Sequence, residues 1–320
     1  MTNKIIEMYK KNLFIRYDDN GDIFYFSPKD FKDIFYQKFE FESSKGYKLK
    51  GNFYYYDNYK KDHIVIFEHG MGGGHLSYFR EIEILARRVY KVLAYDHSGC
   101  MKSEGDNTGG FCQSLCDLND CINSLKNNDE YKNYKISVIG HSWGAFSTMN
   151  IPYFHNDVKH VIAMSGFISL EQMLKQMFGG LFKKCNDLAF ELEKQSNPDF
   201  VNINAIESLS NYDGHALIIH SKDDKTVKCK YHFDVLKNEL SNKNNIEFML
   251  VENKNHNPNY TVEAVKYKDE FFKTYKKYLK KKLLKKVEDK EKFKNSYNWF
   301  KMTQQDFNIW KEVFRVLDNE

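Results

Sequence analysis

One short motif in this chain has the residue types and spacing of a serine nucleophile. Gly140, Ser142 and Gly144 form a G-x-S-x-G pattern that follows the apolar run ISVI and precedes a helical pattern. Glycines on both sides of a serine allow a sharp strand-to-helix turn, which lifts the hydroxyl above the edge of a sheet. A serine that simply begins a helix is the ordinary alternative, but the preceding strand favours a nucleophile.

Residues that could activate this serine follow two later predicted strands. A serine hydroxyl needs a base that removes its proton and a third group that orients the base. Asp223 and Asp224 come three and four residues after the run ALIIH, and His256 comes shortly after the run IEFMLV. The order serine, acid, histidine at successive strand ends predicts a catalytic triad. Asp224 fits the spacing better, and Asp223 is the alternative acid.

Two backbone N–H groups are candidates for an oxyanion hole, which an acyl-transfer enzyme needs. Trp143 directly follows the predicted nucleophile, so its N–H is the first candidate. The glycine-rich segment 69–74 (HGMGGG) follows the apolar run HIVIFE. Because its glycines allow the backbone to approach the site closely, the N–H of Met71 is the second candidate.

Hydrophobic patterning predicts the elements that position these residues. Short, nearly continuous apolar runs are typical of buried parallel strands, and helical patterns lie between most of them. This alternation predicts an α/β fold with a mostly parallel central sheet and helices on both faces. A strand pair is expected at 36–42 and 47–56, buried strands at 63–68, 91–95, 136–139, 160–165, 216–220 and 246–251, and helices at 78–90, 111–125, 145–153 and 231–240.

Three segments lie outside this alternation. Residues 1–35 are expected to form an amino-terminal extension with a β-hairpin, because 14–17 and 23–26 alternate around an Asn-Gly turn signal. Residues 166–215 are helical and rich in Met and Phe, which predicts an inserted lid. Residues 265–320 form a lysine-rich helical region, in which the amphipathic stretch 299–317 is expected to pack on the sheet.

The lysine-rich part of that last region has a strong local charge. Between residues 273 and 294 there are eleven lysines and three acidic residues, although the whole chain carries a formal charge of only +4. Apolar residues recur at a helical spacing, which predicts one surface helix with a solvated lysine face. Contact with an anionic membrane surface or an acidic partner is the alternative. The apolar positions are Phe272, Tyr275, Leu279, Leu283 and Val287.

Composition excludes several classes of protein. The chain has 320 residues, of which 42% are hydrophobic and 16% aromatic, so a disordered or small disulfide-rich protein is excluded. The modest net charge predicts no nucleic-acid partner. No apolar stretch approaches the roughly 18 residues of a membrane span. Residues 1–20 contain no signal-peptide core, so we expect a cytoplasmic protein whose six cysteines are reduced thiols.

Motifs for a cofactor or a metal ion are incomplete. A calcium loop around Gly21 fails because Arg16 stands where the first carboxylate belongs. A dinucleotide-binding loop at 70–74 fails because His75 occupies the third glycine position. No histidine completes a zinc site with the cysteines of the helical pattern at 111–125. We therefore expect neither a cofactor nor a metal ion.

The motifs resemble those of the α/β-hydrolase superfamily, most of all the branch of monoacylglycerol lipases, small carboxylesterases and serine aminopeptidase S33-like proteins. The resemblance covers about residues 36 to 260. Met101 departs from the family pattern D-x-x-G-x-G-x-S, where it stands at the second glycine, and Ser221 and Asn255 also replace glycines. The matching residues are His69, Gly70, Gly72, Asp96, Gly99, Ser103, Gly105, the motif GHSWG at 140–144, Asp224 three residues before Val227, and His256.

The resemblance implies a fold, an activity and a set of site residues. It implies a hydrolase domain over 36–320, in which the insertion 166–215 is a cap that shapes the acyl pocket. The implied activity is hydrolysis of a small-molecule carboxylic ester through an acyl-serine. The alternatives are an S33-type peptidase or amidase, which shares the triad, and a non-catalytic binding protein on the same scaffold. The implied site consists of Ser142 as nucleophile, Asp224 as acid, His256 as base, and the N–H groups of Met71 and Trp143 as oxyanion donors.

Overall fold

The structure is a computed structural model that describes residues 2–21, 24–179 and 183–319. Its centre is one eight-stranded sheet with the strand order β1-β2-β4-β3-β5-β6-β7-β8. The first two strands are antiparallel to their neighbours, and β3 to β8 run parallel. The strands are β1 (Phe35–Glu42), β2 (Lys48–Tyr55), β3 (His63–Glu68), β4 (Lys91–Tyr95), β5 (Lys135–His141), β6 (His160–Met164), β7 (His215–Ser221) and β8 (Ile246–Val251).

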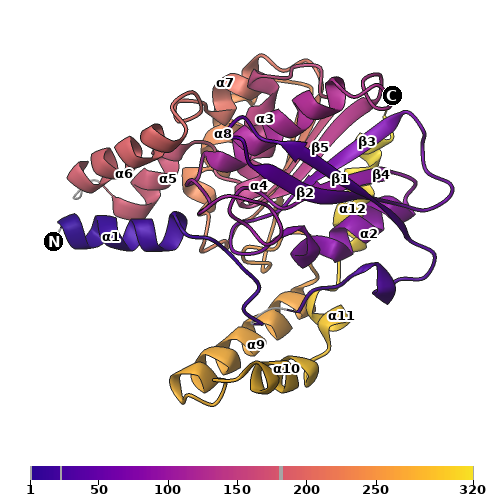
Figure 1. Ribbon diagram of the computed structural model, residues 1–320. Helices are drawn as coiled ribbons and strands as arrows, with labels where there is room; N and C mark the ends of the chain where they lie inside the picture. The colour runs from indigo at the N-terminus through magenta and orange to yellow at the C-terminus, as the bar shows by residue number, and fades with distance from the viewer. Residues whose placement is uncertain (1, 22–23, 180–182, 320) are drawn as a thin grey trace.

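Helices cover both faces of this sheet, as the sequence predicts (Figure 1). On one face, α3 (Gln113–Lys126), α4 (Trp143–Asn150) and α8 (Phe233–Glu239) contribute to one buried hydrophobic cluster. On the other face, α2 (Phe79–Arg87) and α12 (Phe307–Leu317) contribute to a second cluster. Every residue of β3, β4 and β6 is buried, because helices enclose these strands from both sides.

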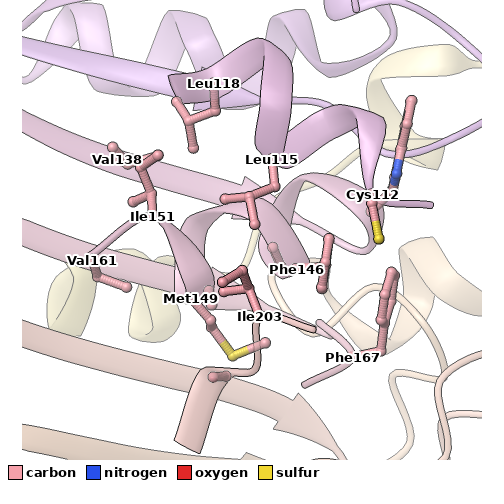
Figure 2. Packing of buried hydrophobic residues seen from close by; sticks show 14 of the residues in the cluster. Cys112, Leu115, Leu118, Val138, Phe146, Met149, Ile151, Val161, Phe167 and Ile203 are labelled. Carbon is pink, nitrogen blue, oxygen red and sulfur yellow. The ribbon is translucent and has the colours of Figure 1, made fainter. Parts of the chain in front are cut away.

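Figure 2 shows how the first of these clusters holds the helix that follows the predicted nucleophile. Side chains of α3 and α4 pack against each other and against the sheet, and several of them have no exposed surface. Close packing of this kind fixes α4 relative to β5, the strand that precedes it. The labelled side chains include Leu115 and Leu118 from α3, Phe146 and Met149 from α4, and Val138 and Val161 from the strands.

The insertion between β6 and β7 is helical in the described residues. It contains α5 (Leu170–Phe178), α6 (Lys183–Ser196) and α7 (Ala205–Ser210). The amino-terminal helix α1 (Thr2–Leu13) lies beside α6 (Figure 1). There the Tyr9 hydroxyl donates a 2.6 Å hydrogen bond to Glu193. The insertion is therefore covered by the start of the chain.

The hairpin expected near the amino terminus is not found in the described part of its segment. Residues 22–23 lie outside the described residues, and the flanking 14–21 and 24–26 contain no strand. Instead, Tyr17 forms an isolated bridge with Cys100 in the loop after β4. The backbone N–H of Tyr17 donates to the Gly99 carbonyl at 2.9 Å. A tertiary partner has therefore replaced the local pairing that the Asn-Gly signal suggested.

The lysine-rich region forms two helices where one was expected. α9 (Val262–Lys280) and α10 (Val287–Asn295) are separated by a turn in which Lys282 has a φ of 57°. The turn exposes Leu279, Leu283 and Val287, so the predicted apolar stripe was wrong at these positions. The cluster that holds the two helices together forms around Phe271.

The amphipathic stretch 299–317 is also divided. A short helix, α11 (Trp299–Met302), precedes α12, and the Asp306 side chain caps α12 by accepting the N–H of Asn308. α12 packs on β6 and β7, which confirms the expected contact with the sheet. None of the described helices is both long and apolar enough to cross a membrane. The described residues also contain short 3₁₀ helices at Pro28–Asp30, His75–Tyr78, Ile151–Tyr153 and Cys229–Tyr231.

Candidate active site

Ser142 lies on a strained turn between β5 and α4. Its backbone has a φ of 57° and a ψ of −114°, a conformation that few non-glycine residues adopt. A Cβ atom on Gly140 would clash with the Gly144 carbonyl, and one on Gly144 would clash with the Glu68 carbonyl. Both glycines of the motif are therefore required for this turn, which presents the serine side chain at the edge of the sheet.

The structure brings Ser142, His256 and Asp224 together. Nε2 of His256 lies 2.8 Å from Oγ of Ser142, and Nδ1 of His256 lies 2.7 Å from Oδ2 of Asp224. The Asp224 side chain has no exposed surface, whereas the His256 side chain is 19% exposed. Because an ionised carboxylate can only accept, the proton of the ring lies on Nδ1, and Nε2 is left to accept the serine O–H.

The surroundings of Asp224 keep it ionised. Burial alone would raise its pKa, but the hydrogen bond and charge of His256 and the N–H of Val227 hold the pKa of Asp224 below its usual range. Its Oδ1 accepts the N–H groups of Thr226 at 2.8 Å and of Val227 at 3.0 Å. A buried carboxylate with these donors can balance a positive charge on the imidazole.

The alternative acid, Asp223, has a different set of contacts. It accepts the hydroxyl of Ser221 at 2.6 Å and the backbone N–H groups of Lys254 and Asn255 at 3.2 Å. These bonds hold the loop that carries His256. Asn255 itself has a φ of 47°, which explains why an asparagine can stand where the family pattern often has glycine.

The two predicted oxyanion donors form no hydrogen bond within the described part of the chain. Neither the N–H of Met71 nor that of Trp143 has an acceptor among the residues that the structure describes. A Cβ on Gly70 would lie only 3.4 Å from Cβ of Ser142, so this loop runs beside the serine. His69 fixes the loop, because its Nδ1–H donates to the Gly70 carbonyl at 2.8 Å.

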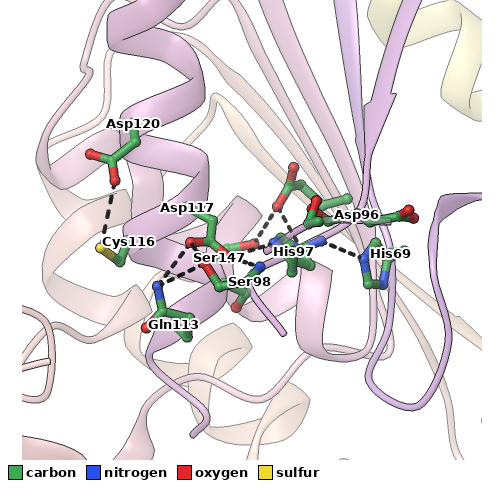
Figure 3. Close-up of polar contacts among 12 residues, drawn as sticks. His69, Asp96, His97, Ser98, Gln113, Cys116, Asp117, Asp120 and Ser147 are labelled. Atoms are coloured by element: carbon green, nitrogen blue, oxygen red, sulfur yellow. Dashed lines mark hydrogen bonds and ion pairs between the residues drawn. The ribbon is translucent and has the colours of Figure 1, made fainter. Parts of the chain in front are cut away.

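A buried charged network that the sequence analysis missed lies behind this loop (Figure 3). The ring of His97 lies between Glu68 and Asp117, at 3.3 Å from each carboxylate, and none of the three side chains is exposed. Burial would lower the pKa of His97, but the two carboxylates outweigh it and raise that pKa. The ring also contacts Trp143 at a centroid distance of 4.8 Å. The sequence offered one indication of this network, which is that the charged residue Glu68 ends an otherwise apolar strand.

Asp96 and His141 have contacts that are typical of structural residues. Asp96 accepts the backbone N–H groups of His75 at 2.9 Å and of Lys102 at 3.2 Å, so it ties down its own loop. His141 contacts the His256 carbonyl through Nε2 at 2.6 Å. Burial lowers the pKa of His141 to about 3, which keeps its ring neutral. Neither residue has a contact that a general base would need.

Met101 has the strained conformation that its place in the family pattern implies. Its φ is 45°, in the region that favours glycine. The Arg16 guanidinium, from the amino-terminal extension, donates to the Met101 carbonyl at 2.7 Å. It also donates to the carbonyls of Ser103 at 3.0 Å and Gly105 at 2.8 Å. The extension therefore stabilises this loop, in which Met101 takes the place of the glycine that would have no strain there.

Two cavities lie among the helices of the insertion and beside the loop after β3. The larger, about 1210 Å³, lies among α5 to α8, with Leu174, Phe190 and Ile206 in its wall. The smaller, about 210 Å³, lies against Gly70–Gly73. Among the described residues, no group of three or more His, Cys, Asp or Glu side chains could hold a metal ion. All six cysteines are buried free thiols.

Comparison with known proteins identifies the fold. Residues 63–209 match the family model for the alpha/beta hydrolase fold. An esterase of Pyrococcus furiosus, Pf2001, is 24% identical, with a TM-score of 0.58 over 81% of this chain and 96% of that chain. Est1E of Butyrivibrio proteoclasticus, solved with ferulic acid, is 18% identical, with a TM-score of 0.56 over 71% of this chain and 94% of that chain.

The matches extend to a peptidase. An acylaminoacyl peptidase of Pyrococcus horikoshii is 17% identical, with a TM-score of 0.51 over 70% of this chain and 37% of that chain. No curated protein matches this sequence. The sheet order, the strand-to-helix turn at Ser142 and the matched family model together show that this chain has the alpha/beta hydrolase fold.

Proposed function

We propose that this protein is a serine hydrolase that cleaves carboxylic esters of small molecules through an acyl-serine intermediate. The observation that carries this proposal is the hydrogen-bonded line from Ser142 Oγ through the His256 ring to Asp224, at 2.8 Å and 2.7 Å. Nucleophile, base and orienting acid have the geometry that activation of a serine requires.

Each residue has a defined part in the reaction. Nε2 of His256 takes the proton of Ser142 while Oγ attacks the ester carbonyl carbon, and the N–H groups of Met71 and Trp143 stabilise the resulting oxyanion. The imidazolium then gives its proton to the departing alkoxide, and the alcohol leaves. A water molecule, deprotonated by the same nitrogen, then attacks the acyl carbon. The imidazolium returns this proton to Oγ of Ser142 as the bond between Oγ and the acyl carbon breaks and the acid leaves. Asp224 holds the ring and balances its charge throughout.

The strain at Ser142 supports catalysis over a purely binding role. A residue with a φ of 57° and a ψ of −114° carries a conformational cost of roughly 1–3 kcal/mol, and such strain is concentrated at active sites. Ester cleavage is favoured over peptidase action of the S33 type. A peptidase that holds a free amino terminus is expected to use a pair of carboxylates, and among the described residues the cavity against Gly70–Gly73 has only Glu81.

The helices of residues 166–215 are the cap in this proposal. Phe167, at the start of the insertion, stacks on Phe146 of α4 at a centroid distance of 4.5 Å. Since α4 begins directly after Ser142, this contact couples the insertion to the proposed nucleophile. The larger cavity lies between this insertion and α8, and in this proposal it accepts an acyl chain.

Replacement of Ser142 tests the proposal. In the Ser142→Ala protein we expect turnover of p-nitrophenyl acyl esters to fall by roughly 10³-fold or more. Labelling by a fluorophosphonate probe should be lost in the same variant. Ser210→Ala, which changes an exposed serine at the end of α7, is the matched control and should behave as wild type. Near-normal turnover by the Ser142→Ala protein would refute the proposal.

A further inference from the structure

The smaller cavity is built by the two ends of the chain around the proposed oxyanion loop. Gly70–Gly73 form one wall, and Phe272 of α9 and Trp299 of α11 form another. The amino-terminal segment closes it, because the ring of Phe24 stacks on Trp299 at a centroid distance of 5.3 Å. The volume of about 210 Å³ is enough for a small acyl or alcohol group.

This cavity adjoins the reacting atoms. His141 and Asn257 both line it, and they are the chain neighbours of Ser142 and His256. Gly70, which packs against Ser142, lines it as well. A substrate whose ester lies at the serine oxygen would therefore place part of its acyl or alcohol group here.

Among the described residues that line this cavity, Lys268 is the one with a cationic side chain. The side chain of Lys268, on α9, lines it and donates a 2.5 Å hydrogen bond to Oδ1 of Asn257. No carboxylate in the described part of the chain forms an ion pair with this ammonium group. The ammonium group also lies over the ring of Tyr260, 5.1 Å from its centroid. Of its three N–H donors, only the one bound to Asn257 has a hydrogen-bond acceptor among the described residues, so a ligand can accept from the others.

The nearby acid, Glu81, has a separate set of partners. Its Oε1 accepts the side-chain amides of Asn259 at 2.9 Å and Gln305 at 3.1 Å. The residue is 2% exposed, and burial raises its pKa toward the neutral acid. Its second oxygen is buried without a hydrogen-bond partner among the described residues. Glu81 is thus occupied by amide donors and offsets the charge of Lys268 only in part.

We propose that this cavity binds a carboxylate group of the ester substrate and that Lys268 is the residue that recognises it. The inference rests on the proposed esterase function and names its substrate class: a small ester with a carboxylate on its acyl part or its alcohol part. The aromatic rings of Phe272 and Trp299 would pack against the body of that group. An ammonium–carboxylate hydrogen bond is charge-assisted and is among the stronger contacts available to a ligand.

The test compares three esters of similar size. p-Nitrophenyl butyrate is neutral, p-nitrophenyl hydrogen succinate carries the carboxylate on the acyl part, and 4-carboxyphenyl butyrate carries it on the alcohol part. We expect wild type to have a higher kcat/KM for one of the two anionic esters than for the neutral ester. In Lys268→Met this ratio should fall by roughly 10-fold to 100-fold, the range of a hydrogen bond to a charged group.

Two further variants control this experiment. Lys276→Met removes an exposed lysine two turns further along α9 and should keep the wild-type ratio. Lys268→Gln keeps a hydrogen-bond donor without the charge, and it replaces the methionine variant if that variant fails to fold. An unchanged ratio in a folded Lys268 variant, or no preference for either anionic ester in wild type, would overturn the inference.

The failure of this inference can be told apart from failure of the proposed function. Hydrolysis of the neutral butyrate without an anion preference would contradict the carboxylate site alone. If wild type hydrolyses none of the esters, the proposed function is contradicted. Calorimetry with p-nitrophenyl hydrogen succinate and Ser142→Ala protein then measures binding without turnover. Tighter binding than in the Ser142→Ala, Lys268→Met double variant supports the site, and equal binding overturns it.

A second inference comes from residues 279–287, which are the end of α9, the turn after it and the first residue of α10, and which we call the α9–α10 tip. Leu279, Leu283 and Val287 are 42%, 52% and 56% exposed there. The tip also contains five exposed lysines and no acidic residue. The two helices extend away from the sheet (Figure 1). Their base is held by an aromatic cluster in which Phe271 stacks on Tyr275.

We propose that the α9–α10 tip docks on an anionic lipid surface. Lysines are attracted to acidic headgroups, and exposed leucine and valine side chains gain stability when they enter the interface. An acidic protein or a nucleic acid would be attracted by the same lysines, but neither accounts for three exposed apolar side chains among them. The combination of charge and apolar exposure at one tip therefore favours a membrane.

Vesicle sedimentation tests this docking. We expect the full chain to bind vesicles of phosphatidylcholine with about one third phosphatidylserine and to bind phosphatidylcholine alone at least 10-fold more weakly, with the difference reduced by salt. Leu283→Ser and Lys281→Glu should each weaken binding several-fold, while Lys237→Glu, which changes an exposed lysine of α8, is the matched control. Absent binding, or binding that Leu283→Ser leaves unchanged in a folded protein, would overturn the proposal.

Discussion

The rim of the sheet that carries Ser142, Asp224 and His256 differs from the C-terminal helices α9–α11 in what positions its residues. At the rim, parallel strands and a strained turn hold each side chain, and the helices around them are packed into the two large hydrophobic clusters. In α9–α11, a small satellite cluster around Phe271 holds the helices together. The residues of the proposed triad are therefore held by the two large hydrophobic clusters. Lys268, the residue proposed to recognise substrate charge, is held by the smaller cluster around Phe271.

The largest expected effect distinguishes two neighbouring carboxylates at the rim. In Asp224→Asn we expect ester turnover to fall by about 10³-fold to 10⁴-fold, because the amide no longer fixes the tautomer of His256 or balances its charge. Asp223→Asn is the matched variant, and turnover there should stay within about 10-fold, since Asp223 holds only the histidine loop. Steady-state kinetics on p-nitrophenyl butyrate measure both. Equal losses in the two variants would contradict the assignment.

The next effect tests whether α9–α11 are a separate unit of stability. Phe271 has no exposed surface and contacts Tyr275, Phe293, Tyr297 and Trp299. Phe271→Ala should cost about 3–5 kcal/mol of stability, as other Phe-to-Ala changes in cores do. We expect hydrogen exchange to speed up in α9–α11 while the strands stay protected. A uniform rise in exchange across the chain would show that the satellite cluster is not independent.

A smaller effect concerns Glu193, which joins α6 to α1. Burial raises the pKa of Glu193 from its ordinary value of 4.5 to about 7, so between these values the folded chain holds a proton that the unfolded chain has lost. The free energy of unfolding should therefore fall as pH rises from about 4.5 to 7, by at most about 3 kcal/mol from this group. Urea unfolding of Glu193→Gln at pH 5 and pH 7 should show a smaller fall than wild type. Identical falls in both proteins would exclude this role for Glu193.

The smallest effect tests the strain at Met101. Because its φ is 45°, Met101→Gly should relieve a backbone cost, partly offset by the greater entropy of glycine in the unfolded chain. We expect a gain of about 1 kcal/mol or less, seen as a slightly higher Tm. When Met101→Gly is made in an Arg16→Met protein, its gain over Arg16→Met alone should be larger, since the guanidinium no longer holds the strained loop. A clear loss of stability on Met101→Gly alone would show that the side chain matters more than its φ.

The sequence predicted the sheet and the chain order of the proposed triad because both depend on local patterns. Buried apolar runs identify the strands, and residues directly after parallel strands share one edge of the sheet. The structure brings Ser142, Asp224 and His256 to that edge, and it separates the roles of Asp223 and Asp224, which adjacent positions in the sequence could not do.

What the sequence could not predict depends on contacts between distant segments. The hairpin signal near Gly21 was overridden by pairing of Tyr17 with the loop after β4. The predicted helical stripe included Leu279 and Leu283, but α9 ends at Lys280 and both side chains are exposed. Lys268 carried no signal of its own, because only the fold shows that this one lysine of a lysine-rich region faces the cavity.

The stacking of Phe24 on Trp299 has a consequence for the order of events during synthesis. Some 275 residues separate these two rings, so the cavity that they close cannot be complete until the last helices have left the ribosome. The sheet can form earlier, with Ser142 and His256 already side by side. A nascent chain would thus acquire its proposed chemical machinery before it acquires its proposed selectivity.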